Sequence, residues 1–127
     1  MEKYELWFRL AYRDIILTKK MTAAVRPGDR RAPNNKGTSI GENVIIRVMK
    51  LPGNEAENIN PIFTDDNIPA KITAIEVKRL QDVTPADLIG CSADCSDWHG
   101  VANQLSLIYN QVFTGPEEVS IVRFEYT

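Results

Sequence analysis

The chain has 127 residues, which fits a single domain over residues 1–127, and its net charge of −2 does not predict nucleic-acid binding. Hydrophobic residues make up 43% and charged residues 25%, as in globular proteins, and no apolar run approaches the roughly 18 residues that span a bilayer. The first ten residues include acids and lack the basic start and apolar middle of a signal peptide, so we expect a cytoplasmic protein without membrane contact.

The N-terminal third predicts a strand, a short helix and a second strand. Residues 4–10 alternate between two faces and predict a half-buried strand. Residues 12–20 carry apolar side chains at helical spacing and predict a short helix. Residues 22–26 are small and compatible with a strand, and Pro27-Gly28 predicts a turn after them.

Two polar loops interrupt the middle of the chain. Residues 27–42 are polar and contain glycines, which predicts a long loop. Residues 43–50 alternate and predict a strand. Residues 51–69 hold acids and prolines and predict a second surface loop, and residues 70–80 are rich in Ile, Val and Thr and predict another strand.

The C-terminal third predicts two helices and a closing strand. Thr84 can cap a helix that begins at Pro85. Apolar residues from Trp98 to Val112 recur at helical spacing, with Ser96 as the expected cap. Residues 119–126 alternate again and predict the last strand. Strands that follow one another without regular helical crossovers predict an α+β fold, in which a small curved sheet or barrel packs against helices.

The charges are distributed unevenly. Residues 11–36 contain seven basic side chains and two acidic ones, whereas the rest of the chain contains eight basic and fifteen acidic ones. A basic segment on an acidic body suits an anionic ligand at that segment, although a solvated basic loop would have the same composition. The acidic remainder suits, as a further alternative, a protein partner.

A metal site is the first chemical alternative to consider. Cys91, Cys95 and His99 are spaced by four residues and would share one face of a continuous helix, with Asp94 as a possible fourth zinc ligand. Gly90 interrupts such a helix, and no second Cys or His pair exists in the chain. We therefore expect free cysteines, no metal and no cofactor. A Cys95–His99 nucleophile pair is the less favoured alternative.

Four stretches, taken in order, resemble the ASCH domain of the PUA-like superfamily. They are Y-R-D-I-I-L-T-K-K-M-T-A-A-V-R, G-E-N-V-I-I-R-V, A-I-E-V-K-R-L-Q-D-V-T-P-A-D-L and V-S-I-V-R-F-E-Y, about 70 residues in all. The resemblance implies a curved sheet or β-barrel with flanking helices and a cleft beside the first helix. It also implies binding of RNA, a nucleotide or a modified nucleoside. One bacterial branch of the family deacetylates acetylcytidine with a Lys, a Thr and a downstream Glu.

The family motif is matched in part. Arg26 takes the place of the motif's Arg, but Met21 and Ala24 then fall where the reactive Lys and the Glu or Thr are expected. Lys20 and Thr22 lie one or two residues out of step, and a shift of one residue on a strand turns a side chain to the opposite face. A downstream acid would be Asp94 or Asp97.

Three functions follow from these patterns. The first is a binding module in which Arg26 anchors RNA or a nucleoside and Lys20, Arg30 and Arg31 contact phosphates. The second is an amidohydrolase for an acylated nucleoside such as acetylcytidine, with Lys20 and Thr22 as catalytic groups. The third is a small protein-interaction or phage-type accessory protein.

Overall fold

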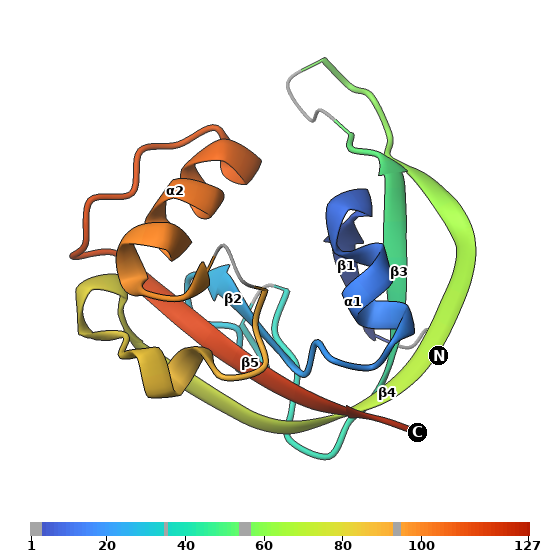
Figure 1. Ribbon diagram of the computed structural model, residues 1–127, viewed down its shortest axis with the longest axis horizontal. Coiled ribbons are helices and arrows are strands. Elements are labelled where there is room, and N and C mark those ends of the chain that lie inside the picture. The colour runs from blue at the N-terminus through green and yellow to red at the C-terminus, as the bar shows by residue number, and fades with distance from the viewer. Residues whose placement is uncertain (1–3, 35, 54–56, 93–94) are drawn as a thin grey trace.

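The computed structural model describes residues 4–34, 36–53, 57–92 and 95–127. These residues form one sheet with two helices beside it (Figure 1). The strands are β1 (Tyr4–Arg9), β2 (Ala23–Pro27), β3 (Asn43–Leu51), β4 (Ile62–Arg79) and β5 (Glu118–Tyr126). The helices are α1 (Arg13–Leu17) and α2 (Trp98–Tyr109), and three short 3-10 turns are η1 (Leu10–Tyr12), η2 (Leu80–Asp82) and η3 (Pro85–Leu88). No helix within the described ranges is long and apolar enough to cross a membrane.

The sheet has the order β1-β3-β4-β5-β2. β1 runs parallel to β3, and the other neighbours are antiparallel. The two edge strands are therefore β1 and β2, which are the first two strands in the sequence. The expected α+β fold with a curved sheet and flanking helices is confirmed.

The long strand β4 produces the curvature. Its first half pairs with β3 and its second half pairs with β5, and residues 70–72 lie where the two pairings meet. Figure 1 shows β4 as one continuous arc that carries the sheet round from β3 to β5. Register shifts on both sides of the arc increase the local twist. The five strands thus form a curled half-barrel, with α1 beside β1 and β3 and with α2 near β2 (Figure 1).

Two hydrophobic cores lie on opposite sides of the β2–β5 pair. Ala24, Val122 and Phe124 belong to the first core, together with Ile16 of α1. Val25 of β2 belongs to the second core, which lies under α2 and also contains residues 119 and 121 of β5. Successive side chains of a strand point to opposite faces, so one pair of strands serves both cores.

The predicted loop over residues 51–69 is wrong for residues 62–69, which form the start of β4. Prolines and acidic residues favoured a loop in the sequence, but the strand accommodates both. Pro69 pairs with Ile45 on one side, whereas pairing with β5 begins at Ala70, so the missing N–H of the proline interrupts no ladder bond to β5. Asp66 is neutralised by Arg13 of α1.

The bounds of other elements also differ from the predicted ones. The helix predicted over residues 12–20 is the shorter α1, preceded by η1, and Pro27 lies within β2. Asp97, not Ser96, caps α2, because the Asp97 side chain accepts the N–H of Gly100 at 2.8 Å. That helix ends at Asn110, in the left-handed conformation, so Val112 lies beyond it. The remaining strand predictions and the Thr84 cap are confirmed.

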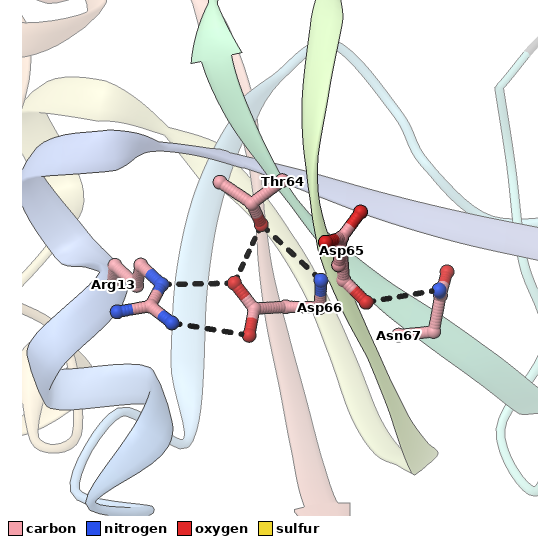
Figure 2. A network of polar contacts seen from close by, with 5 residues as sticks. All are labelled: Arg13, Thr64, Asp65, Asp66 and Asn67. Carbon is pink, nitrogen blue, oxygen red and sulfur yellow. Dashed lines mark hydrogen bonds and ion pairs between the residues drawn. The ribbon is translucent and has the colours of Figure 1, made fainter.

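An ion pair fixes α1 against the start of β4, as Figure 2 shows. Arg13 donates from Nε to Asp66 Oδ2 at 2.9 Å and from Nη2 to Oδ1 at 3.4 Å. Thr64 adds a hydroxyl donor to the same carboxylate at 2.5 Å. The Arg13 hydrogen bond, with help from Thr64, lowers the pKa of Asp66 below its usual value.

This pair predicts a pH-dependent contribution to stability. A lowered folded-state pKa means that Asp66 stabilises the fold above its unfolded pKa of about 4, and that this contribution is lost as the pH falls through the folded value. We expect Asp66→Asn to lower the unfolding free energy at pH 7 and the difference from wild type to shrink below pH ~4. Urea unfolding across that range measures it. Asp65→Asn is the control, since the Asp65 carboxylate has no ion-pair partner in the described chain, and an equal response from both variants would contradict the assignment.

Candidate functional site

A cleft opens between β1, β2 and α2. Its free space is about 420 Å³, counting the part open to solvent. Helix α2 lines one wall with Val101, Gln104, Leu105 and Ile108. These positions are spaced by three and four residues, so they form a single face of the helix. Gln104 is the polar member of that face.

The opposite wall comes from the two edge strands and the segments next to them. Phe8 of β1 and Tyr12 of η1 lie on one side, and Ala24 and Arg26 of β2 lie on the other, with Met21 just before that strand. Because the cleft draws residues from both hydrophobic cores, most of its lining is apolar. The lining of the cleft therefore contains few polar groups.

Arg26 joins the two edge strands. Its Nη2 donates to the backbone oxygen of Trp7 at 2.8 Å, and its guanidinium lies 4.8 Å from the centre of the Phe8 ring. A cation at this distance over an aromatic face is attracted to it. β1 and β2 have no backbone pairing with each other in the sheet, so this side chain bridges the strands where the half-barrel is open.

A turn at Gly90 forms the third side of the cleft. Its carbonyl accepts the N–H groups of Thr22 at 2.9 Å and Ala23 at 3.3 Å. Gly90 has φ +92°, and a methyl group on it would overlap the Thr22 hydroxyl. Only glycine therefore fits this close approach without strain. The turn delivers Cys91 and Ser92 to the lining of the cleft.

The segment before this turn is held by polar contacts. The Thr84 side chain and the Asp87 carboxylate form a capping box at the start of η3. Lys78 pairs with Asp87 at 2.8 Å, and Arg123 of β5 donates to the backbone oxygens of Asp87 and Ile89. These bonds anchor the loop that carries Gly90 onto the sheet.

The residues considered for catalysis fall into two groups: those that line the cleft and those that do not. Met21 and Ala24, which occupy the reactive positions of the family motif, line the cleft. Lys20 is exposed and Thr22 is half-buried, and neither contributes to the lining. The cleft thus presents a thioether and a methyl group where the motif has functional side chains.

Arg30 and Arg31 lie beyond the other end of β2. The five residues of that strand, which span about 17 Å, lie between them and Lys20 in the chain. The Nε of Arg30 donates to the backbone oxygen of Pro27 at 2.8 Å. Arg31 pairs with Asp29 at 2.6 Å, and its hydrogen bonds lower the pKa of Asp29 to about 2. The basic residues of the sequence are therefore divided between two places.

The cysteines are free thiols, as expected. Cys91 and Cys95 both line the cleft. Burial, with a smaller effect of Cys95, raises the pKa of Cys91 to about 11, so at neutral pH this group is a thiol and a poor nucleophile. His99 is exposed and stacks on Trp98 at 3.8 Å between ring centres.

The downstream acids give no catalytic group that can be placed in the cleft. Asp97 is exposed and caps α2, and Asp94 lies outside the described residues. Among the residues with described positions, no group of three or more His, Cys, Asp or Glu side chains could hold a metal ion.

Sequence reasoning missed Gln104. Its Oε1 accepts the phenolic O–H of Tyr12 at 3.3 Å, which joins α2 to η1 across the cleft. The available signal was a polar residue among apolar ones on the face formed by Val101, Leu105 and Ile108. An amide in that setting has polar atoms directed at something other than the core.

Comparisons of the whole chain agree with this architecture. The structure resembles an ASCH domain from Lactobacillus crispatus JV V101, with a TM-score of 0.58 and 11% identity over 91% of this chain and 70% of the other. This is the ASCH fold. Protein EF3133 from Enterococcus faecalis V583, of the DUF984 family, gives a TM-score of 0.55 and 15% identity.

The chain is shorter than these two structural relatives. The match with EF3133 covers 90% of this chain and 65% of EF3133, so this chain spans about two thirds of that protein. No family model matches the sequence, and no curated protein matches it. At this level of identity the likeness establishes the fold, and the α+β, ASCH-type architecture expected from the sequence is confirmed.

The Gly90 turn gives a prediction about the integrity of the cleft. Gly90→Ala combines an unfavourable φ with a clash, so we expect it to lower the unfolding free energy by about 1–3 kcal/mol. Gly28→Ala is the matched control, because φ there is +80° but the added carbon meets nothing within 4 Å. Denaturant unfolding should rank Gly90→Ala below Gly28→Ala. Equal losses would show that packing against Thr22 is unimportant.

Proposed function

We propose that the cleft binds the base of a nucleoside or nucleotide, either free or as part of RNA. The observation that carries this proposal is Arg26, whose guanidinium is fixed at a mostly apolar cleft by the Trp7 carbonyl and the Phe8 ring. A preorganised guanidinium loses little further freedom when it binds an anion.

The lining suits a flat, partly polar ring. Apolar side chains from Phe8, Val101 and Leu105 offer contact to the faces of a base. Gln104 and Tyr12 offer an amide and a phenol to its polar edge, which is how proteins read unpaired bases.

The charges near the cleft suit a phosphate or carboxylate. One nitrogen of Arg26 is engaged by Trp7, and its other donors have no partner among the residues described. These can form charge-assisted hydrogen bonds with an anion. Lys20 at one end of β2, and Arg30 and Arg31 beyond the other, would contact phosphates of a longer ligand.

Binding experiments test the proposal directly. Titration of a panel of nucleosides, mononucleotides and short single-stranded RNA should detect binding at low salt, and binding of the charged ligands should weaken as salt rises. Arg26→Ala should weaken binding about 10- to 100-fold, because it removes hydrogen bonds to a charged donor. Arg26→Lys, which keeps the charge but loses the planar fork, should give an intermediate affinity.

The control variant is Arg79→Ala, which removes an equal charge from an exposed site at the end of β4. Far-UV circular dichroism must show that the Arg26 variants stay folded, because Arg26 also bridges β1 and β2. An unchanged affinity in folded Arg26→Ala, or equal losses in the Arg26 and Arg79 variants, would remove Arg26 as the anchor.

Hydrolysis of an acylated nucleoside such as acetylcytidine is the second candidate. It is favoured by the positions of Lys20 and Thr22 on either side of Met21, which lines the cleft. In this candidate Lys20 and Thr22 are the catalytic groups. Incubation with acetylcytidine, followed by chromatography, should then yield cytidine, and Lys20→Ala should abolish the product. Absence of product with folded wild-type protein would exclude this activity.

A further inference from the structure

A group of one exposed and two partly buried side chains lies on the face of the sheet opposite the first core. It consists of Trp7 on β1, Arg47 on β3 and Phe63 on β4, which we call the outer aromatic cluster. The Trp7 and Phe63 rings meet edge to face with centres 5.0 Å apart, and the Arg47 guanidinium lies 3.9 Å from the centre of the Phe63 ring. Trp7 remains 44% exposed. The cluster is thus ordered by its own contacts while one large ring stays open to solvent.

The cationic members of this face are weakly neutralised. Arg47 is paired with Glu5 at 3.6 Å, and both side chains are partly exposed, so this pair contributes little. The Nε atoms of Arg47 and of Arg9, at the end of β1, are buried and meet no acceptor in the described part of the chain. Arg47 is held by stacking on Phe63 and by Glu5, whose carboxylate also accepts the Trp7 indole N–H at 2.9 Å. The exposed carboxylate of Asp65 lies further along, on β4.

The outer aromatic cluster adjoins the cleft through β1. Trp7 and Phe8 are consecutive, so their side chains lie on opposite faces of the strand. Phe8 lines the cleft beneath the Arg26 guanidinium, and the Trp7 carbonyl accepts the hydrogen bond from Arg26. Arg26 therefore lies at the edge that separates the two faces. A chain that leaves the cleft past Arg26 arrives at Trp7.

We propose that the outer aromatic cluster is a second base-stacking subsite, occupied by the nucleotide next to the one held in the cleft. This inference rests on the proposed function and narrows it, because the ligand becomes single-stranded nucleic acid rather than a free nucleoside. Arg26 contacts the phosphate between the two bases, and Trp7 stacks on the second base. Every base offers a π-face to an exposed indole, and nearby guanidinium groups track the backbone. A duplex is excluded, since its bases are not free to separate around β1.

Comparison of ligand lengths tests the inference. In wild type a tetranucleotide should bind at least about tenfold more tightly than the mononucleotide, as expected for one added stacking contact. Trp7→Leu should remove most of this gain in affinity, and Trp7→Phe should restore part of the loss. Tyr109→Leu is the matched control, because Tyr109 is an aromatic residue of similar exposure at the end of α2.

Fluorescence gives a second readout that does not depend on a loss of affinity. Trp7 and Trp98 are the two tryptophans of the chain, so Trp98→Phe leaves Trp7 as the reporter. The tetranucleotide should quench its emission and the mononucleotide should not.

The outcomes separate the two proposals. Mononucleotide binding with no gain from length and no response to Trp7→Leu would overturn the second subsite and leave the cleft proposal intact. No binding of any nucleotide would overturn both. Trp7-dependent self-association in sedimentation, without an effect on oligonucleotide affinity, would overturn the inference in favour of a protein interface.

Discussion

The contact of Arg26 with Trp7 and Phe8 is the constraint on which the site depends. The sheet curls far enough to bring its two edge strands near each other, but they do not form a backbone ladder. A guanidinium can bridge such a gap, since it donates in its plane and stacks through its face. Here it donates to a carbonyl of β1 while its face meets a ring of the same strand. The open seam of the half-barrel is thereby held at a width that leaves a cleft.

The cleft lies where the two cores meet, and this explains its composition. β2 and β5 direct alternate side chains to the two sides, with Ala24 in the first core and Val25 in the second. Where neither core fills the junction, apolar side chains from both are left facing the same space. Polar groups enter from segments that are fixed separately, such as Gln104 on α2 and Ser92 after the Gly90 turn. A lining drawn from both cores and from separately fixed segments is mostly apolar and contains few polar groups, as in small-molecule sites.

The sequence was informative where one face of an element is buried and the other is not. Alternation identified β1, β3 and β5, and the ordered resemblance identified the architecture, because both depend on regular patterns. The start of β4 was missed because Asp66 and Pro69 are acceptable there for tertiary reasons, an ion pair with Arg13 and a missing neighbour strand. Gln104 was missed since its role depends on a contact with Tyr12, 92 residues away in the chain. Arg30 and Arg31 looked continuous with Lys20 in the sequence, but a five-residue strand separates them.

If the cleft binds a ligand at Arg26 as proposed, the contacts of Arg26 with Trp7 and Phe8 make closure of the sheet and occupation of the cleft parts of one equilibrium. A group that binds the free nitrogens of this side chain while Nη2 stays on the Trp7 carbonyl restrains the guanidinium further, and so restrains the spacing of β1 and β2. A group that competes for Nη2 has the opposite effect and releases the strand edge. By thermodynamic linkage, if ligand binding changes the closure equilibrium of the seam by some factor, closure of the seam changes the ligand affinity of the cleft by that same factor. In the proposed function, one residue therefore couples the spacing of β1 and β2 to the ligand.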